Sequence, residues 1–586
     1  MRVNVRQRRA GESPGGRDPS IMNKSRRAFL GTGVAAVAAA HAPQGSAAEA
    51  RDTFLDIIRP PDFVAAYVEG AGGITLSKSA GRWQAADVEV TTEVRQGKNL
   101  AVSVASPRSP LERLHLRWGG RLPEGSRFLG DHWERSYGDL EWRGFAADRV
   151  MPWYFLVATG QGTHGYGVKT GASAFCFWQA DAEGISLWLD VRNGGSGVQL
   201  GERRLAAAEV VALRGHPDAS PYQAACTLCG ALAEHARLPE KPVYGSNNWY
   251  YLYGENMSAE NVLRDVEQLA ELSPLAVNPP YMVMDEGWGK ARGGAGPWTE
   301  DDLRFPEVPS LPAQMKKRGV RPGIWVRPLL TVDPRAKGWK LAGDRKPPFP
   351  DLPFVLDPSL PEALAYIQEG LRRVTGWGYE LVKHDYSTAD ILGRWGMRMG
   401  EELTSEGWHF ADRSKTSAEI VLQFYRALRQ AVGDALLLGC NTVGHLGVGI
   451  FDLQRTGDDT SGRDWNRTRK MGVNTLGFRL PQHRAFFLVD PDCAPVSKSV
   501  PLAMTRQWLD VVARSGAVLF ISADPAAVTA EEKSLLKAAL TAAAQIQPPA
   551  EPLDWMETIT PQRWRLGGET ARFTWFGEDG VDFFPK

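Results

Sequence analysis

The chain has 586 residues, 43% of them hydrophobic, and its 68 basic and 68 acidic residues give a formal net charge of zero. This length allows two or three domains with cores of their own. The balanced charge gives no electrostatic basis for binding nucleic acid or an anionic membrane surface, so we expect neither as a partner.

The first 50 residues predict an export signal. From Met22, a candidate start of translation, paired arginines at 26–27 precede an apolar run of small residues over 29–40 and Ala-x-Ala-like sites at 47–50. This pattern resembles a bacterial twin-arginine signal, which implies a periplasmic or secreted protein. The apolar run of about a dozen residues is too short to cross a bilayer about 30 Å thick, and we find no later run long enough for a membrane span.

Residues 51–238 predict an antiparallel β-sandwich. Short runs with period-2 alternation, such as ADVEVTTEV, NLAVSVAS and GISLWLDV, are separated by Gly-rich turns. The Trp-rich stretch GDHWERSYGDLEWRGF, residues 130–145, lies inside this region. It belongs either to the core of the sandwich, which is the interpretation we favour, or to an edge loop that reaches another domain.

Residues 239–545 predict a (β/α)8 barrel, because short apolar runs alternate with helix-length segments. The expected strands are 243–247, 281–284, 323–326, 379–383, 435–440, 450–453, 486–489 and 517–521. Segments that begin SAEN and SAEI predict helices with Ser or Thr caps. A doubly wound sheet is the alternative. Residues 546–586, which alternate over RWRLGGETARFTWFG, predict a short C-terminal β region.

The five cysteines do not predict a disulfide framework, because their number is odd and their spacing sparse. They are Cys176, Cys226, Cys229, Cys440 and Cys493. Cys226 and Cys229 form a CxxC pair, but no second pair or histidine cluster completes a zinc site. We therefore expect no cofactor and no resident metal.

Polar side chains follow most of the predicted barrel strands. They are Asp285, Glu286 and Trp288 after strand two, Trp325 and Arg327 at strand three, Lys383, His384 and Asp385 at strand four, Cys440 and Asn441 at strand five, the segment 455–465 after strand six and the segment 490–492 after strand seven. In a barrel these ends face one mouth, where the active sites of this fold lie.

Two carboxylates at one mouth suit the cleavage of a glycosidic bond, and Asp385 and Asp458 are the candidates. One carboxylate attacks the anomeric carbon, and the other protonates the leaving oxygen and then deprotonates water. A retaining pair stands about 5–5.5 Å apart and an inverting pair about 6.5–9.5 Å apart. Lys383, two residues before Asp385 and on the same side of the strand, would keep Asp385 ionised.

Several segments in order resemble the α-galactosidase (melibiase-like) glycoside hydrolases of families 27 and 36. MVMDEGW resembles their strand-two Asp-Asp-Gly-Trp pattern, and the segment from VLDPS to VKHDY resembles the one that ends in the Lys-x-Asp of the nucleophile. RFPEVPSLPAQMKKRGVRPGIWVRP, GCNTVG with FDLQRTGDDT, and FFLVDPD match further segments. The resemblance covers about 240–520 and implies a β-sandwich, a barrel and a small β-domain.

The resemblance also implies roles for individual residues. Asp385 would be the nucleophile of a retaining double displacement and Asp458 the acid/base, with Asp459 as the substitute because the Arg-to-Asp spacing of family 27 fits it better. The implied contacts of the sugar are Asp285, Glu286 and Lys383 with ring hydroxyls, Cys440, Asn441 and Arg455 near C2, and Trp249, Trp288 and Trp325 as ring platforms. The family often associates, so a homo-oligomer is one expectation.

The sequence departs from the family in the residues that recognise the sugar. Glu286 replaces the second Asp of strand two, His384 replaces an aromatic residue before the nucleophile, and NTVGHLG replaces a Gly-rich run. The segment PDLP also stands where family 36 enzymes often carry an Arg. We therefore predict a retaining exo-α-glycosidase that removes terminal α-linked sugars from oligo- or polysaccharides, with an α-galactoside as the leading substrate.

Other functions stay open at this point. An α-N-acetylgalactosaminidase, another α-glycosidase or a transglycosylase of the same clan would use the same residues. A non-catalytic carbohydrate-binding protein would have lost a catalytic carboxylate, and both candidates are present. The segment DDTSGRD, with Asp458, Asp459 and Asp464, could also form a divalent metal loop, although it lacks the ligand spacing of an EF-hand.

Overall fold

The computed structural model describes residues 53–79, 81–341 and 353–576. The export signal predicted for residues 1–50 lies outside the described residues, and so does the end of the chain from 577. In the described part no helix is long and apolar enough to cross a membrane.

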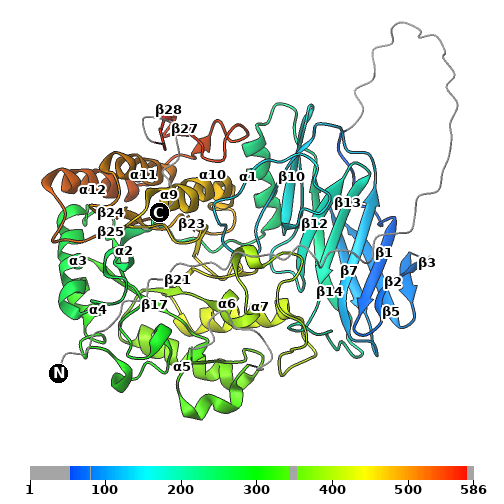
Figure 1. Cartoon of the computed structure of the whole chain (residues 1–586), viewed down its shortest axis with the longest axis horizontal. Coiled ribbons are helices and arrows are strands. Elements are labelled where there is room, and N and C mark those ends of the chain that lie inside the picture. The colour runs from blue at the N-terminus through cyan, green and yellow to red at the C-terminus, as the bar shows by residue number, and fades with distance from the viewer. Residues whose placement is uncertain (1–52, 80, 342–352, 577–586) are drawn as a thin grey trace, which may run out of the picture. The chain divides into compact units, whose positions relative to one another are not determined.

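Two antiparallel sheets form the N-terminal sandwich, as the alternating sequence predicts (Figure 1). The first sheet has the order β2 (Gly72–Thr75), β1 (Phe63–Val68), β7 (Leu111–Gly119), β13 (Gly184–Asp190), β12 (Phe175–Asp181) and β9 (Met151–Pro152). The second has the order β3 (Ser77–Ser79), β4 (Arg82–Ala85), β5 (Val88–Arg95), β6 (Asn99–Ala105), β14 (Leu205–Leu213), β11 (Gly162–Val168), β10 (Tyr154–Thr159) and β8 (Arg127–Gly130). Helix α1 (Pro221–Leu232) carries Cys226 and Cys229 as free thiols and packs on β11 and β14.

A parallel sheet of nine strands follows and curls into the predicted barrel, with β23 and β24 at its two ends. Its strands are β15 (Tyr244–Asn247), β16 (Tyr281–Met284), β17 (Arg321–Val326), β20 (Leu381–His384), β21 (Leu436–Gly439), β22 (Leu453–Arg455), β23 (Leu488–Asp490), β24 (Ala494–Val496) and β25 (Leu519–Ala523). Some of the strands read as unbroken apolar runs, such as YMVM in β16, because both faces of a barrel strand are covered, while others, such as LVKH in β20, carry polar residues at their carboxyl ends.

Helices surround these strands (Figure 1). The longer ones are α3 (Ala259–Leu272), α4 (Leu311–Lys317), α5 (Pro361–Gly376), α7 (Ser417–Val432), α11 (Leu502–Ser515) and α12 (Ala530–Ala543). Ser258 caps α3, and Thr416 forms a capping box with Glu419 at the start of α7. Both caps confirm the helix starts predicted from the sequence.

Most strand ends differ from the predicted ranges by one or two residues, and two strands differ in a more informative way. The sixth begins at Leu453 and not at Ile450, because Ile450 and Phe451 turn back to hydrogen-bond the Gly447 carbonyl. The seventh is β23, which pairs with β22, and it is followed by the short strand β24, which was not predicted and pairs with β25. Pro491 has no N–H for a ladder and Asp492 has φ 74°, so the strand breaks between Asp490 and Ala494.

A small antiparallel sheet ends the described chain. It contains β26 (Glu551–Pro552), β27 (Arg563–Leu566) and β28 (Glu569–Arg572), which fits the predicted C-terminal β region. Trp564 and Trp575 are fully buried in it.

The Trp-rich stretch 130–145 combines the two interpretations, because Trp133 packs against Phe175 and Phe177 of the sandwich while the backbone after it reaches the barrel. Trp133 and Trp142 are buried, but the backbone of Ser136 pairs with strand six: its N–H donates to the Thr456 carbonyl (2.8 Å), and its carbonyl accepts from the Asp458 N–H (2.9 Å). Glu134 and Arg135 contact residues at the barrel mouth, whereas Asp139 pairs with His132 and Glu141 with Arg143 inside the stretch.

The close approach of β15 to its neighbour β16 depends on the glycine at position 245. A Cβ on Gly245, where φ is +156°, would lie 1.8 Å from the Tyr281 carbonyl oxygen of β16. We expect Gly245→Ala to destabilise the protein by about 3 kcal/mol or more, measured by thermal or urea unfolding. Gly230→Ala is the control, because Gly230 lies in α1 with open space around its Cα, and it should be neutral or slightly stabilising. Equal stability of the two variants would contradict this account of the packing.

Candidate functional site

Asp385 follows β20 and is held by three hydrogen bonds. The Trp325 indole N–H donates to Oδ2 (3.0 Å), and the backbone N–H groups of Tyr386 (2.7 Å) and Asn441 (3.1 Å) donate to Oδ1. Burial favours the protonated carboxyl, but the charges of Arg135 and Lys383 and the Trp325 hydrogen bond outweigh it and lower the pKa of Asp385. The carboxylate is therefore ionised and fixed in orientation.

The residue after Asp385 has a strained backbone. Tyr386 has φ 63°, which is unusual for a residue other than glycine. The Arg327 guanidinium lies 4.1 Å from the Tyr386 ring centroid and makes a buried bidentate ion pair with Asp390 (2.5 and 2.9 Å). Such strain persists where the surroundings impose it, often at functional sites.

Lys383 pairs with Asp285, although the sequence suggested a direct role toward Asp385. Lys383 Nζ donates to Asp285 Oδ2 at 2.7 Å, and Asn247 Nδ2 donates to the same oxygen at 2.6 Å. The charge of Lys383 still lowers the pKa of Asp385. Glu286 lies beside them, and burial together with the charge of Asp285 raises its pKa to about 7.

Asp458 and Asp459 have different environments. Asp458 is bound by Arg135 (2.7 Å) and Arg467 (2.8 Å), and its side chain is 17% exposed. Asp459 is 40% exposed and has longer contacts with Arg135 (3.5 Å) and Arg455 (3.2 Å). Desolvation favours the neutral form of Asp459, but the charges of Arg135 and Arg455 outweigh it and lower its pKa to about 2. The negative charge of Asp459 also acts to raise the pKa of Asp385, against the effect of the neighbouring cations.

Arg135 comes from the sandwich and was not among the predicted site residues. It is buried at 7% exposure, it bridges the two aspartates, and its Nη1 lies 3.9 Å from Cys440 Sγ. Its neighbour Glu134 accepts from the Gly396 N–H (2.9 Å) and from Asn441 Nδ2. A Glu-Arg pair among tryptophans in 130–145 is the sequence signal that could have indicated this contact.

Arg455 and Asn441 are buried residues that contact the carboxylates of the site directly. Arg455 is 1% exposed and pairs with Asp492 (2.9 Å) as well as Asp459, and it donates to Cys440 Sγ (3.4 Å). Asn441 Oδ1 accepts from the Ala389 N–H (3.2 Å). Asp464, the third acid of the possible metal loop, caps helix α9 (Trp465–Thr468).

The predicted ring platforms differ in exposure. Trp288 and Trp325 are each 2% exposed, and the Trp288 indole N–H donates to the Trp325 carbonyl (2.9 Å). Gly294 packs on the Trp325 ring, where an added Cβ would lie 2.2 Å from the nearest ring carbon. Trp249 is half-buried and packs edge-on against Tyr253. Of the three indoles, that of Trp249 is the one open enough to contact a sugar.

His384 occupies an aromatic environment. Its ring packs edge-on against Phe424, Tyr425 and Phe451, and neither ring nitrogen has a hydrogen-bond partner among the described residues. Burial lowers the pKa of His384 to about 3, so the ring is neutral at pH 7. The ring therefore packs as an apolar aromatic group among aromatic neighbours.

The comparisons with known proteins identify the fold. No protein-family profile matches the chain, and no curated protein sequence matches it. TtGalA, the α-galactosidase of Thermus thermophilus solved with p-nitrophenyl α-D-galactopyranoside, superposes with a TM-score of 0.57 at 18% identity, over 87% of this chain and 98% of that one.

Two family 36 α-galactosidases of Geobacillus stearothermophilus are also similar. AgaB gives a TM-score of 0.55 at 16% identity, over 82% of this chain and 74% of its own, and AgaA gives 0.54 at 15% identity, over 82% and 73%. The predicted resemblance to these glycoside hydrolases, with a sandwich followed by a barrel, is thus confirmed in the fold.

The neutral state of His384 predicts an acid-sensitive stability. The folded pKa, about 3, lies below the ordinary value of 6.5, so the contribution of this group is complete above pH 6.5 and is lost as the pH falls toward 3. Between pH 7 and pH 5 the loss is about 2 kcal/mol. We expect His384→Phe to unfold at a higher urea concentration than the wild type at pH 5, with a smaller difference at pH 7.

His216→Gln is the control for this experiment, because the His216 side chain is 73% exposed. It should follow the wild type at both pH values. If His384→Phe had the same pH dependence as the wild type, the buried neutral state of His384 would be wrong.

Proposed function

We propose that this protein is a retaining exo-α-glycosidase of the α-galactosidase type. The observation that carries the proposal is the Asp385 carboxylate, which is kept ionised and fixed by three hydrogen bonds at the mouth of a barrel. The shared fold with α-galactosidases supports it. TtGalA and AgaA are solved with stachyose and raffinose, respectively, so terminal α-galactosides of such oligosaccharides are the first candidates for the substrate.

In the proposed reaction, Asp385 attacks the anomeric carbon and forms a glycosyl ester as the glycosidic bond breaks. The leaving oxygen takes a proton from the acid/base. The same group, now a carboxylate, then removes a proton from water, and this water cleaves the ester and releases the sugar with its original configuration. Trp325 and the two backbone N–H groups orient the nucleophile and leave its charge available.

We infer that Asp459 is the acid/base, while Asp458 holds Arg135. Asp459 is the more exposed of the two and has the longer ion-pair contacts, and its charge acts on Asp385. An acid must carry a proton, whereas both arginines favour the ionised form of Asp459. Sugar hydroxyls that accept hydrogen bonds from Arg135 and Arg455 would weaken these ion pairs and raise the pKa of Asp459 when substrate binds.

The identity of the sugar depends on Glu286. With a pKa raised to about 7, its carboxyl can both donate and accept hydrogen bonds near neutral pH, and it is one methylene longer than an Asp. An α-N-acetylgalactosaminide or another α-linked sugar is therefore the second candidate, and hydrolysis of a panel of aryl α-glycosides discriminates between them. Export by the twin-arginine route and homo-oligomerisation stay predictions.

Loss of the nucleophile should abolish turnover. We expect Asp385→Ala to lower kcat/KM for p-nitrophenyl α-galactoside, or for the preferred sugar of the panel, by roughly four orders of magnitude while the protein stays folded. Asp434→Ala, which removes an exposed acid, serves as the control and should keep wild-type activity. Substantial turnover by a folded Asp385→Ala protein would exclude Asp385 as the nucleophile.

The two neighbouring aspartates can be separated by leaving-group dependence. We expect Asp459→Ala to lose far more activity on an oligosaccharide than on an aryl glycoside, because a good leaving group needs less protonation. Azide should restore turnover and give an α-glycosyl azide. Asp458→Ala should impair both substrates alike, since it releases Arg135. If azide instead rescued Asp458→Ala alone, the acid/base would be Asp458.

A further inference from the structure

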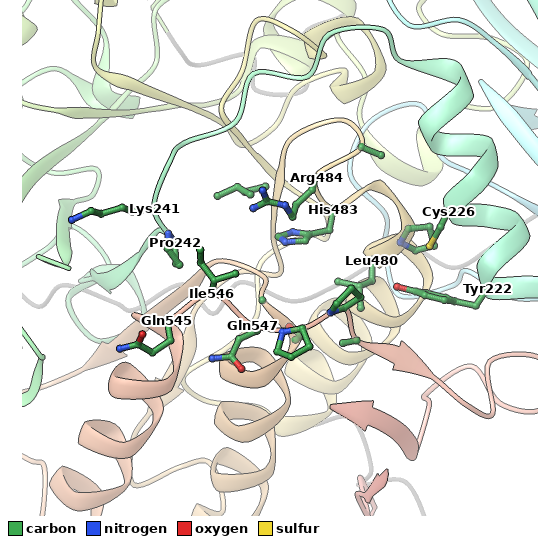
Figure 2. A pocket seen from close by; sticks show the side chains of 18 residues that line it. Tyr222, Cys226, Lys241, Pro242, Leu480, His483, Arg484, Gln545, Ile546 and Gln547 are labelled. Carbon is green, nitrogen blue, oxygen red and sulfur yellow. The ribbon is translucent and has the colours of Figure 1, made fainter. Parts of the chain in front are cut away.

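A hollow of about 510 Å³ lies at the end of the barrel opposite the candidate site (Figure 2). Lys241 and Pro242 precede β15, Ser515 and Gly516 precede β25, and Leu488 begins β23, so the amino ends of these strands form one wall. The candidate site lies at the carboxyl ends. This hollow is therefore a separate feature of the fold.

The walls of the hollow are mainly apolar. Leu480 and Leu488 form one side, and the segment after α12 with Ile546 and Pro548 forms another. Ile546 is 77% exposed, although a large aliphatic side chain in water is unfavourable. A concave volume of this size is typical of sites for small molecules, whereas protein partners usually bind broader, flatter surfaces.

The charged side chains of the hollow are all basic, and its other polar side chains are neutral hydroxyl, amide, thiol and imidazole groups. Among the residues that line it, all within the described chain, there is no Asp or Glu. Arg484 and Lys241 stand at its edge, and no acidic side chain pairs with either one among the described residues. A ligand that carries a negative charge would therefore meet two positive charges at this edge. Glu551, whose charge acts on Tyr222 and Cys226, lies toward the other end of the hollow and is itself paired with Arg565 (2.7 Å).

His483 supplies a further donor, next to Arg484 (Figure 2). The Val489 N–H donates to His483 Nδ1 (3.3 Å), so the proton of the neutral ring is on Nε2. Nε2 faces Gly516, where an added Cβ would lie 3.8 Å away. Burial and the charge of Arg484 lower the pKa of His483 to about 4, so the ring acts at pH 7 as a hydrogen-bond donor without charge.

The backbone of Arg484 is strained in the way that functional loops often are. Its φ is 62°, a conformation that costs a residue other than Gly or Asn about 1 kcal/mol. The Arg484 N–H is held by the Phe487 carbonyl (2.8 Å).

We propose that this hollow binds a small amphipathic carboxylate, with its aliphatic or aromatic body on Leu480, Leu488 and Ile546 and its carboxylate on Arg484 and His483 Nε2–H. Lys241 adds attraction at the edge. The site is independent of the glycosidase chemistry proposed above, because its residues lie at the other end of the strands.

The test uses the full-length protein with 8-anilinonaphthalene-1-sulfonate as a fluorescent probe and octanoate as the competitor. Octan-1-ol, which has the same chain without the charge, is the matched ligand control. We expect saturable probe binding that octanoate displaces at least about tenfold more effectively than octan-1-ol. Arg484→Asn keeps the backbone conformation, which Asn tolerates, and should weaken octanoate binding about tenfold or more.

Ile546→Asp places a negative charge at the exposed edge and should weaken octanoate binding as well. Arg108→Gln, an exposed arginine of the sandwich, should leave binding unchanged. Equal displacement by octanoate and octan-1-ol, or unchanged binding by a folded Arg484→Asn protein, would overturn the proposal. So would a wild-type dimer, seen by light scattering, that Ile546→Asp dissociates and that binds no probe, because a second copy would then cover the hollow.

Discussion

A single buried guanidinium, that of Arg135, holds the candidate site together. Removing a charge from water is costly unless an opposite charge and hydrogen bonds replace the solvent, and Arg135 finds both in Asp458 and Asp459. Arg455 continues the series to Asp492, and Lys383 pairs with Asp285 on the other side of Asp385. The mouth of the barrel is therefore an alternating array of charges, in which the position of each carboxylate depends on its cationic neighbours.

The sequence predicted the barrel well because its signal is local. Parallel strands covered on both faces, such as β16, need consecutive apolar residues, and the polar residues that follow them mark the strand ends. The errors arose where the backbone departs from this pattern. Ile450 and Phe451 look like a strand but form a turn after α8 (Gly444–Gly447), and beyond Pro491 lies the short strand β24, which was not predicted from the sequence.

The site was harder to predict, because its contacts join distant segments. Asp385, Lys383 and Asn441 follow strand ends and were found by position, but Arg135 stands 323 residues before Asp458 and belongs to another domain. The residue type alone also did not show which tryptophan side chains are buried and which are open to a sugar. Trp288 and Trp325 read as sugar platforms, whereas the Trp288 indole N–H donates to the Trp325 carbonyl and the Trp325 indole N–H donates to Asp385. The choice between Asp458 and Asp459 likewise needed the side-chain environments.

The loop from Glu134 to Tyr137 also has a consequence for how such a protein can evolve. A barrel cut from this chain would keep every strand-end residue, yet Asp458 and Asp459 would face each other without Arg135, and Asn441 would lose Glu134. Recombination that exchanged the sandwich for an unrelated domain would therefore deliver an intact barrel with a defective mouth. The sandwich and the barrel are thus constrained to be inherited as one unit, and one continuous cluster of buried apolar residues also joins them.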